Sequence, residues 1–277
     1  MSNYNRFDID KKKRTYEQWF LLTSDWHFDN TKCNRELLFK HLDEAKKRDA
    51  KIIVNGDLLC LMQGKYDKRS SKGAIRQEHN TDSYLTAVIY DTADKLAPYA
   101  ENIIQINSGN HETAVSQRAE VNITQMLVDR LNQISGQNIA VGEYMGYILC
   151  TFTGHKSHHK KLVIAYDHGH WGGVITKGTL SVVRHSSIFP QADVVMSGHT
   201  HDGWIVPHQQ FSLNANKKKV EIRKQWHIKT GTYKEEFESG KGWAVEKLAM
   251  PKYLGSCWMK VSYFYEKDLE LEFTLTP

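Results

Sequence analysis

Five apolar, β-forming segments of this chain each end in side chains that can bind a metal ion. The segments occupy residues 18–25, 50–57, 102–112, 161–170 and 192–201. Stretches with the apolar spacing of a helix separate the early segments, for example Asn34–Arg48 with Leu38, Leu42 and Ala45 on one face. Similar apolar stripes at 85–96 and 123–134 predict two further helices. This alternation is typical of an α/β fold whose sheet is largely parallel at its start.

The polar side chains at the five strand ends follow a definite order. They are Asp25-Trp26-His27, Gly56-Asp57, Gly109-Asn110-His111-Glu112, Asp167-His168-Gly169-His170 and Gly198-His199-Thr200-His201. The carboxyl ends of parallel strands gather along one edge of a sheet, so we expect these groups to lie together. Each motif alone often occurs in an ordinary turn, but all five in this order, each at the end of a strand, are not expected by chance. Gathering so many polar groups in a cleft without a metal would be costly, so the sequence predicts a metal site.

Length and composition favour one large domain. The chain has 277 residues, of which 40% are hydrophobic, enough for a substantial core. Its first residues lack the apolar core of a signal peptide, and no run approaches the roughly 18–20 apolar residues of a membrane span. We therefore expect a cytoplasmic protein with no membrane contact. Four scattered cysteines without a CxxC pair indicate free thiols rather than disulfides or a cysteine-based zinc site.

Two regions of the predicted domain, 1–277, stand apart in composition. A polar, basic insertion lies at about 61–83, and loops of that length are usually functional or disordered. From 204 to 277 the pattern changes to short predicted strands. This β-rich part could complete a second sheet or form a small cap over the site, and we favour the first.

Taken in order, the five motifs resemble those of the calcineurin-like metallophosphoesterase superfamily, whose pattern is DxH, GD, GNH(D/E), HGH and GHxH. Here the pattern appears as SDWH, NGD, SGNHE, DHGH and SGHTH. The resemblance implies a two-sheet β-sandwich flanked by helices, the four-layer α/β/β/α fold of that superfamily. That fold agrees with the α/β pattern of the segments.

The resemblance also implies a site for two divalent ions. One ion would be bound by Asp25, His27 and His201, and the other by Asn110, His168 and His199, with Asp57 bridging them. The family usually binds through the first histidine of HGH, so His170 is expected to orient a ligand instead. Imidazole, carboxylate and amide ligands suit manganese, which we favour, or iron, zinc or cobalt.

The chemistry implied is hydrolysis of a phosphoester. Two ions about 3.5–4 Å apart polarise a phosphoryl oxygen and lower the pKa of a bridging water, whose hydroxide attacks phosphorus. His111 follows a predicted ligand without being assigned to either metal, and we predict that it protonates or stabilises the leaving group. Glu112 is expected to cap the following helix.

Differences from known subfamilies reduce the number of candidate substrate classes. Gly56-Asp57 continues as LLCLM rather than as the Val-Asp-Arg-Gly type of the protein phosphatases. Cys60 and His27 stand where purple acid phosphatases have a tyrosine ligand and a glycine. What remains is the broad group with the DxH motif, which resembles Mre11-type nucleases, cyclic-nucleotide phosphodiesterases and small phosphatases.

Side chains near the motifs favour a phosphodiester, such as DNA, RNA or a nucleotide. The candidates for substrate binding are Trp26, Trp171, Trp204, Arg69 and Arg76. Each tryptophan either packs beneath a motif loop or stacks a nucleobase. Basic patches in the insertion, at 155–161 and at 217–224 are either solvated faces or anion-binding surfaces, and the net charge of +5 is compatible with an anionic substrate. Two alternatives stay open: a small-molecule phosphomonoesterase and a catalytically silent scaffold.

Overall fold

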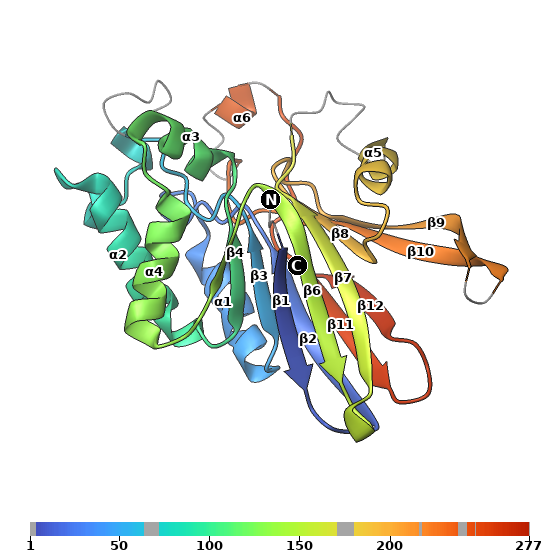
Figure 1. The fold of residues 1–277 in the computed structure, drawn as a ribbon. Helices are drawn as coiled ribbons and strands as arrows, with labels where there is room; N and C mark the ends of the chain where they lie inside the picture. Colours follow the sequence, from blue (N-terminus) through green and yellow to red (C-terminus); the bar gives the residue numbers. More distant parts are fainter. Residues whose placement is uncertain are drawn as a thin grey trace.

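The computed structural model describes residues 4–63, 72–170, 180–215, 218–237, 243–246 and 248–276 (Figure 1). The strands are β1 (Tyr4–Asp10), β2 (Thr15–Thr23), β3 (Lys51–Asn55), β4 (Ile103–Asn107), β5 (Ala140–Gly142), β6 (Met145–Thr153), β7 (His159–Asp167), β8 (Val194–Ser197), β9 (Trp204–Asn214), β10 (Lys219–Lys229), β11 (Cys257–Phe264) and β12 (Glu270–Leu275). The helices are α1 (Arg35–Lys47), α2 (Tyr84–Leu96), α3 (Asn110–Ala119), α4 (Ile123–Ser135), α5 (Leu180–Ile188) and α6 (Trp243–Glu246), with short 3₁₀ turns at Lys72–Ala74, Gln77–His79, Ala97–Tyr99 and His155–Ser157.

The strands form two mixed six-stranded sheets. One sheet has the order β12-β11-β2-β3-β4-β5, in which β2 to β5 run parallel and the two C-terminal strands antiparallel. This confirms the largely parallel start of the fold. The other sheet has the order β1-β6-β7-β8-β10-β9. The C-terminal part therefore extends both sheets.

The two sheets face each other and helices cover their outer faces, which gives the four layers α/β/β/α. Between the sheets lies a core that includes Phe20, Phe152 and Met259. The outer core beneath α1, α2 and α4 contains Leu38, Leu42 and Ala45, the predicted stripe of the first helix. A smaller cluster beneath α5, around Phe189 and Val195, covers the other sheet. The predicted fold class is confirmed.

Several elements differ from the sequence-based expectation. The motif-bearing strands do not share one sheet edge, since β2, β3 and β4 lie in one sheet and β7 and β8 in the other. The strands β1 and β6, which the periodicity did not indicate, pair in parallel at the start of the second sheet. The predicted short strands after residue 204 are wrong at one place, because β9 and β10 form an antiparallel hairpin of 11 residues each.

Of the basic insertion, residues 61–63 and 72–83 belong to the described chain, whereas Lys65, Lys68 and Arg69 lie outside it, as do Trp171 and Lys217. The described part contains two 3₁₀ turns. Among the described residues, none of the helices has the length and apolar character needed to cross a bilayer.

Candidate metal centre

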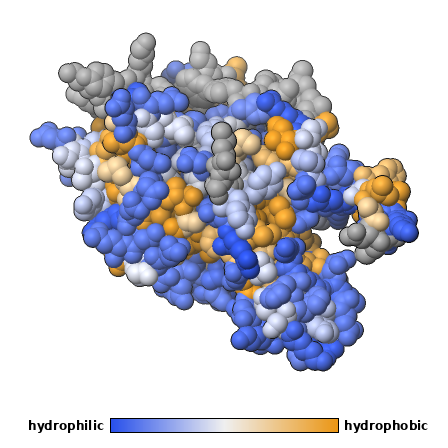
Figure 2. All heavy atoms as spheres, in the orientation of Figure 1, coloured by the Kyte–Doolittle hydropathy of each residue, from blue (hydrophilic) through white to orange (hydrophobic). Residues whose placement is uncertain are grey.

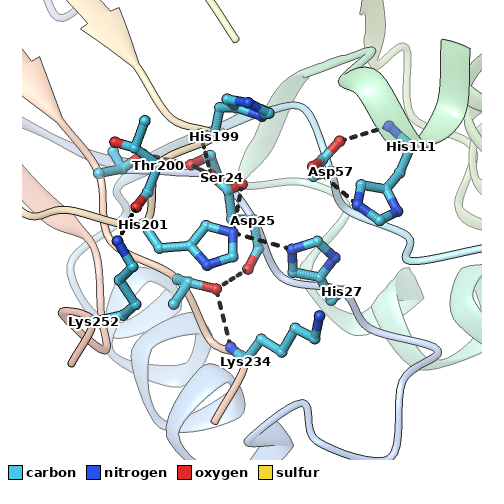
Figure 3. Close-up of polar contacts among 12 residues, drawn as sticks. Ser24, Asp25, His27, Asp57, His111, His199, Thr200, His201, Lys234 and Lys252 are labelled. Atoms are coloured by element: carbon cyan, nitrogen blue, oxygen red, sulfur yellow. Dashed lines mark hydrogen bonds and ion pairs between the residues drawn. The ribbon is translucent and has the colours of Figure 1, made fainter. Parts of the chain in front are cut away.

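The five motifs meet in the loops at one end of the sandwich, the upper end in Figure 1. Backbone hydrogen bonds join the ends of neighbouring strands: Asp25 N donates to Gly56 O (3.0 Å) and His27 N to Asp57 O (3.0 Å). A further bond from Gly198 N to His168 O (2.9 Å) joins the ends of β8 and β7. The N–H of His199 also donates to Asp25 Oδ2 (3.0 Å), so the motif loops of the two sheets are connected (Figure 3).

Asp25, His27 and His201 bring one ligand atom each within 4.8 Å of one another. The Nε2 atoms of His27 and His201 are 3.3 Å apart, and Asp25 Oδ1 lies 3.2 Å from His201 Nε2. Ser24 Oγ and the backbone N–H of His199 hold the other oxygen of Asp25. The first predicted ligand set is thus gathered around a common point.

Asp57, His168 and His199 form a second such group. Asn110 Oδ1 lies 3.1 Å from His168 Nε2 and 2.7 Å from His199 Nδ1, and His168 Nε2 lies 3.2 Å from Asp57 Oδ2. His168 Nδ1 donates to the carbonyl of Asn55 (2.8 Å), and this bond turns Nε2 toward the group. All four residues predicted for the second ion, the bridging Asp57 included, are therefore in reach of one another.

The backbone of these loops adopts an uncommon conformation. Five of the predicted ligands have positive φ: Asp25 (53°), His27 (48°), Asp57 (49°), His199 (69°) and His201 (60°). For residues other than glycine this left-handed region costs on the order of 1 kcal/mol or more each, and such strain concentrates at functional sites. The fold thus tolerates strained backbone to direct these side chains inward.

Two buried carboxylates hold the loop that follows β3. Glu112 accepts from the N–H groups of Gly109 (2.8 Å), Asp57 (3.1 Å) and Leu59 (2.9 Å). The bond from Gly109 caps α3, as predicted, and the other two tie that helix to the bridging residue. Asp29 accepts from the backbone of Cys60 and Leu61 and from the hydroxyl of Tyr84. Sequence patterns gave no sign of Asp29.

Neighbouring charges oppose the effect of burial on the pKa of some groups in the site and add to it at others. Burial would raise the pKa of Asp57, but His168 and His111 hold it well below its usual range. Burial would lower the pKa of His168, but Asp57 raises it to about 10. His199 has its pKa lowered to about 4 by burial and then by His168. The site therefore favours the protonated form of His168, which lies beside Asp57, and the neutral form of His199.

These residues fit divalent ions. Asp25 Oδ1 is buried and makes no directed hydrogen bond with any described residue, although His201 Nε2 is 3.2 Å away. Two imidazole nitrogens that face each other at 3.3 Å, with a carboxylate oxygen beside them, are what a shared cation would require. Uncompensated buried carboxylates are costly, and a bound ion would remove that cost.

His111 lies beside the two ligand groups. Its Nδ1 contacts the carbonyl of Cys60, and a carbonyl only accepts, so Nδ1 carries a hydrogen. Its Nε2 faces Asp57 Oδ2 at 3.7 Å. The thiol of Cys60 lies within 4.8 Å of ligand atoms of His27 and His111 and accepts from Asn30 Nδ2 (3.2 Å). The sequence placed Cys60 where purple acid phosphatases have a tyrosine ligand, and in the structure its thiol lies beside these histidines.

The predicted substrate-binding residues separate into different roles. Trp26 is fully buried, and its indole donates to Thr23 Oγ1 (2.6 Å), so it packs beneath the site. Trp204 is half-buried near Lys229 Nζ, 5.9 Å from its ring centre. His170 Nε2 bonds Arg184 of α5 (2.8 Å) rather than a predicted ligand. Arg76 donates to the carbonyls of Asn30 and Cys33, which docks the described part of the insertion onto the first motif loop.

Three lysines that the sequence did not single out surround the first ligand group. Lys234 extends beneath His27 in Figure 3 and pairs with Glu236 (2.9 Å). Lys252 Nζ donates to Thr200 O (2.8 Å), and Lys229 Nζ donates to Thr200 Oγ1 (3.0 Å). No motif marks them, because they follow His201, the last histidine of the motifs, by 28 or more positions and only the fold brings them close to it.

A sequence model described as calcineurin-like phosphoesterase matches residues 19–203, a span that contains every predicted metal ligand. The chain belongs to this family. Membership indicates a metal-dependent phosphoesterase, and the two groups described above are candidate sites for its divalent ions. No curated protein matches this chain.

Solved structures with a similar course of the chain share little sequence with it. The zinc complex of Vps29 from Entamoeba histolytica is 12% identical, with a TM-score of 0.39 over 93% of this chain and 98% of that one. GAP50 of Plasmodium is 10% identical, with a TM-score of 0.45 over 94% of this chain and 84% of that one. The calcineurin-like phosphoesterase YfkN from Bacillus subtilis is 14% identical, with a TM-score of 0.37 over 94% of this chain and 90% of that one. At these values the similarity adds nothing about the substrate of this family member.

Proposed function

We propose that this family member is a phosphodiesterase that acts on nucleic acid or nucleotides. A diester carries a substituent on each side of phosphorus, so its site needs room beside the metals for the second one. A hollow of about 340 Å³ lies beside the first ligand group, lined in part by Lys234, Phe237 and Lys252. None of its lining residues is a predicted ligand, but one hydrogen bond links it to the first group: Tyr253, next to Lys252, donates its N–H to His201 O (3.2 Å). This hollow is the observation that favours a diester.

The lining suits a nucleotide. Phe237, Pro251 and Leu254 offer apolar contact for a base or sugar, and the two lysines offer positive charge for a neighbouring phosphate. Both lysines pair with single carboxylates, Glu236 and Asp202.

In the proposed reaction two groups of residues would hold the ions: Asp25, His27 and His201 in one, and Asn110, His168 and His199 in the other, with Asp57 available to both. Two divalent ions bound there would supply Lewis-acid polarisation of the phosphoryl group and of the attacking water. The Nδ1–H of His111 donates to Cys60 O, so the hydrogen that the side chain would give to the leaving oxygen is one carried on Nε2.

The test compares substrates on the manganese-loaded protein. We expect hydrolysis of bis-p-nitrophenyl phosphate and single-stranded DNA to exceed that of p-nitrophenyl phosphate, and Asp57→Asn to abolish all of it. Phe237→Ala should raise KM for a dinucleotide while leaving the aryl diester unchanged. Preference for the monoester would refute the proposal in favour of a phosphomonoesterase. Absence of hydrolysis, with metal bound, would favour a scaffold.

The role of His111 has its own measurement. His111→Asn should lower kcat for DNA by about 10²–10⁴, since its alkoxide leaving group needs a proton. Nitrophenolate leaves without one, so bis-p-nitrophenyl phosphate should lose much less. Equal losses on both substrates would remove His111 from the proton-transfer step.

A further inference from the structure

The hairpin β9–β10 leaves the body of the protein. Its two strands pair from Trp204 and Lys229 to Asn214 and Lys219, whereas β8 pairs with β10 only at 226–229. Residues 208–214 and 219–225, which we call the arm, therefore form a two-stranded ribbon that projects to the right in Figure 1. A ribbon of two strands is marginally stable in water unless something packs on it.

One face of the arm near its tip is apolar and uncovered. Phe211 lies opposite Ile222, and Leu213 lies opposite Val220. These side chains are 83%, 64%, 72% and 65% exposed, respectively. Because side chains alternate along a strand, all four lie on the same face. Figure 2 shows them as an apolar patch at the end of the projection.

At the root of the hairpin the same face belongs to the core. Ile228, four residues after Lys224 and therefore on the same face of the strand, is fully buried between the sheets. Trp226 packs on Phe273 of β12, with 4.9 Å between the ring centres. The apolar face of the tip is thus the continuation of the face that β12 covers at the root of the hairpin. Because the tip extends past β12, its apolar side chains lack the packing partner that the root has.

A cleft opens where the arm leaves the body, and Figure 2 shows the hollow beside the projecting tip. Its volume is about 1000 Å³, and its apolar lining includes Leu162, Trp226, Leu269 and Leu271. One wall, the turn between β11 and β12 with the start of β12, carries the acids Glu266, Asp268 and Glu270 and one lysine, Lys267. The rest of the lining carries Lys160, Lys161, Lys224 and one acid, Asp193. Neither Asp268 nor Glu270 forms an ion pair within the part of the chain that the structure describes.

Charges at the tip complement one wall of this cleft. Lys218 and Lys219 are exposed beside the apolar patch. Lys219 pairs with Glu221 of the same strand (3.0 Å), whereas Lys218 makes no ion pair with any described residue. A tip lying in such a cleft would place its lysines toward Asp268 and Glu270 and away from Lys160 and Lys161. Apolar contact would hold the tip and the charges would fix its orientation.

We propose that two copies of this chain form a two-fold dimer by exchanging arms, with the tip of each arm in the cleft at the root of the other. A two-fold interface needs both halves on one surface, and here tip and cleft lie at opposite ends of the same ribbon face. Two arms stacked face to face and antiparallel place each tip over the partner's root. The contact is made twice, and each copy supplies both an apolar tip and an acidic wall.

The experiment is light scattering after size exclusion on the full chain. We expect twice the monomer mass of 32.0 kDa for the wild type. The pair Phe211→Ser and Ile222→Ser should give the monomer mass, with unchanged circular dichroism and unchanged turnover of an aryl phosphoester at saturation. The matched control is Met126→Ser, an exposed apolar residue on α4, which should stay dimeric.

A charge exchange tests the pairing itself. Lys218→Glu with Lys219→Glu makes one chain, and Asp268→Lys with Glu270→Lys makes another. Alone, each should be monomeric, because like charges then meet in both contacts. Mixed, they should form a heterodimer, because an acidic tip meets a basic wall and a basic tip an acidic wall. Failure of the mixture to associate would overturn the arm exchange.

A wild-type chain that is monomeric at micromolar concentration would also overturn it. In that case, sedimentation with vesicles containing phosphatidylserine would tell whether the apolar, basic tip binds an anionic lipid surface instead. None of the substituted residues lies among the predicted metal ligands or the lining of the nucleotide hollow, so the outcome is independent of the proposed function.

Discussion

Replacing Gly56 by alanine should damage both the stability of the fold and the metal centre. Gly56 has φ of +81°, and a Cβ there would lie 2.7 Å from Gly109 Cα, 2.8 Å from Gly109 N and 2.5 Å from His168 Nδ1. None of these atoms can retreat easily. Gly109 N is bonded to Glu112, and His168 Nδ1 to Asn55 O.

The magnitude follows from two contributions. An L-residue at positive φ costs about 1–2 kcal/mol, and crowding of a packed site typically about 1–3 kcal/mol. Gly56→Ala should therefore lower the free energy of unfolding by about 2–5 kcal/mol. Gly136 ends α4 with φ of +70° and would meet no atom within 4 Å, so Gly136→Ala isolates the first contribution.

The assay is urea unfolding of both variants, combined with calorimetric titration of the apo-proteins with Mn²⁺. We expect the Gly56 variant to lose more stability than the Gly136 variant and to bind manganese more weakly, because the added methyl pushes the β3, β4 and β7 ends apart. Equal loss of stability in the two variants, or wild-type manganese affinity in Gly56→Ala, would refute the packing argument.

Three further predictions concern the groups around this centre and elsewhere in the fold. Glu112→Gln should lower the free energy of unfolding by about 1–3 kcal/mol, since an amide nitrogen would face backbone N–H groups, whereas Glu120→Gln at the end of α3 should not change the thermal midpoint. Burial, and then His185 and His208, lower the pKa of His227 to about 4. The unfolded chain then takes up that proton first, so stability should fall by about 1–2 kcal/mol between about pH 6.5 and pH 4. Urea midpoints at the two pH values should show this loss in the wild type and a smaller one in His227→Gln. Burial raises the pKa of the four thiols, Cys33, Cys60, Cys150 and Cys257, to about 12. The folded protein should therefore leave an aromatic disulfide reagent unreacted at about pH 8 and react fully in urea; a fast-reacting thiol in the folded state would contradict this.

Local patterns were enough for the elements that carry the motifs. The stripe Leu38, Leu42 and Ala45 marked α1, because a helix facing one core repeats every three to four residues. The apolar runs before Asp25 and Asp57 marked β2 and β3, since strands buried on both faces read as continuous apolar segments. Weakly apolar strands such as β1, with its alternating exposed pattern, gave no comparable signal.

The site shows the same division. Short motifs marked the predicted ligands because each directs a metal-binding side chain from the end of a strand. Local sequence carries no information on which distant residues join them. Lys234 and Lys252 come from the C-terminal part. Asp29 holds the loop after β3 through two backbone hydrogen bonds and accepts a third from Tyr84 of α2. Arg76 has the composition of an anion-binding residue, yet its guanidinium donates to the carbonyls of Asn30 and Cys33.

By itself, the sequence determined which side chains bear the chemistry, the alternation of strand and helix, and the family, since these depend on residue type and short spacing. Only the tertiary structure decided that the five strand ends are shared between two sheets, and that the hairpin after Trp204 extends an interior face past its cover. Both are consequences of strand pairing between distant segments. Pairing depends on which edges remain free once the core has formed, and no local pattern of residues encodes that.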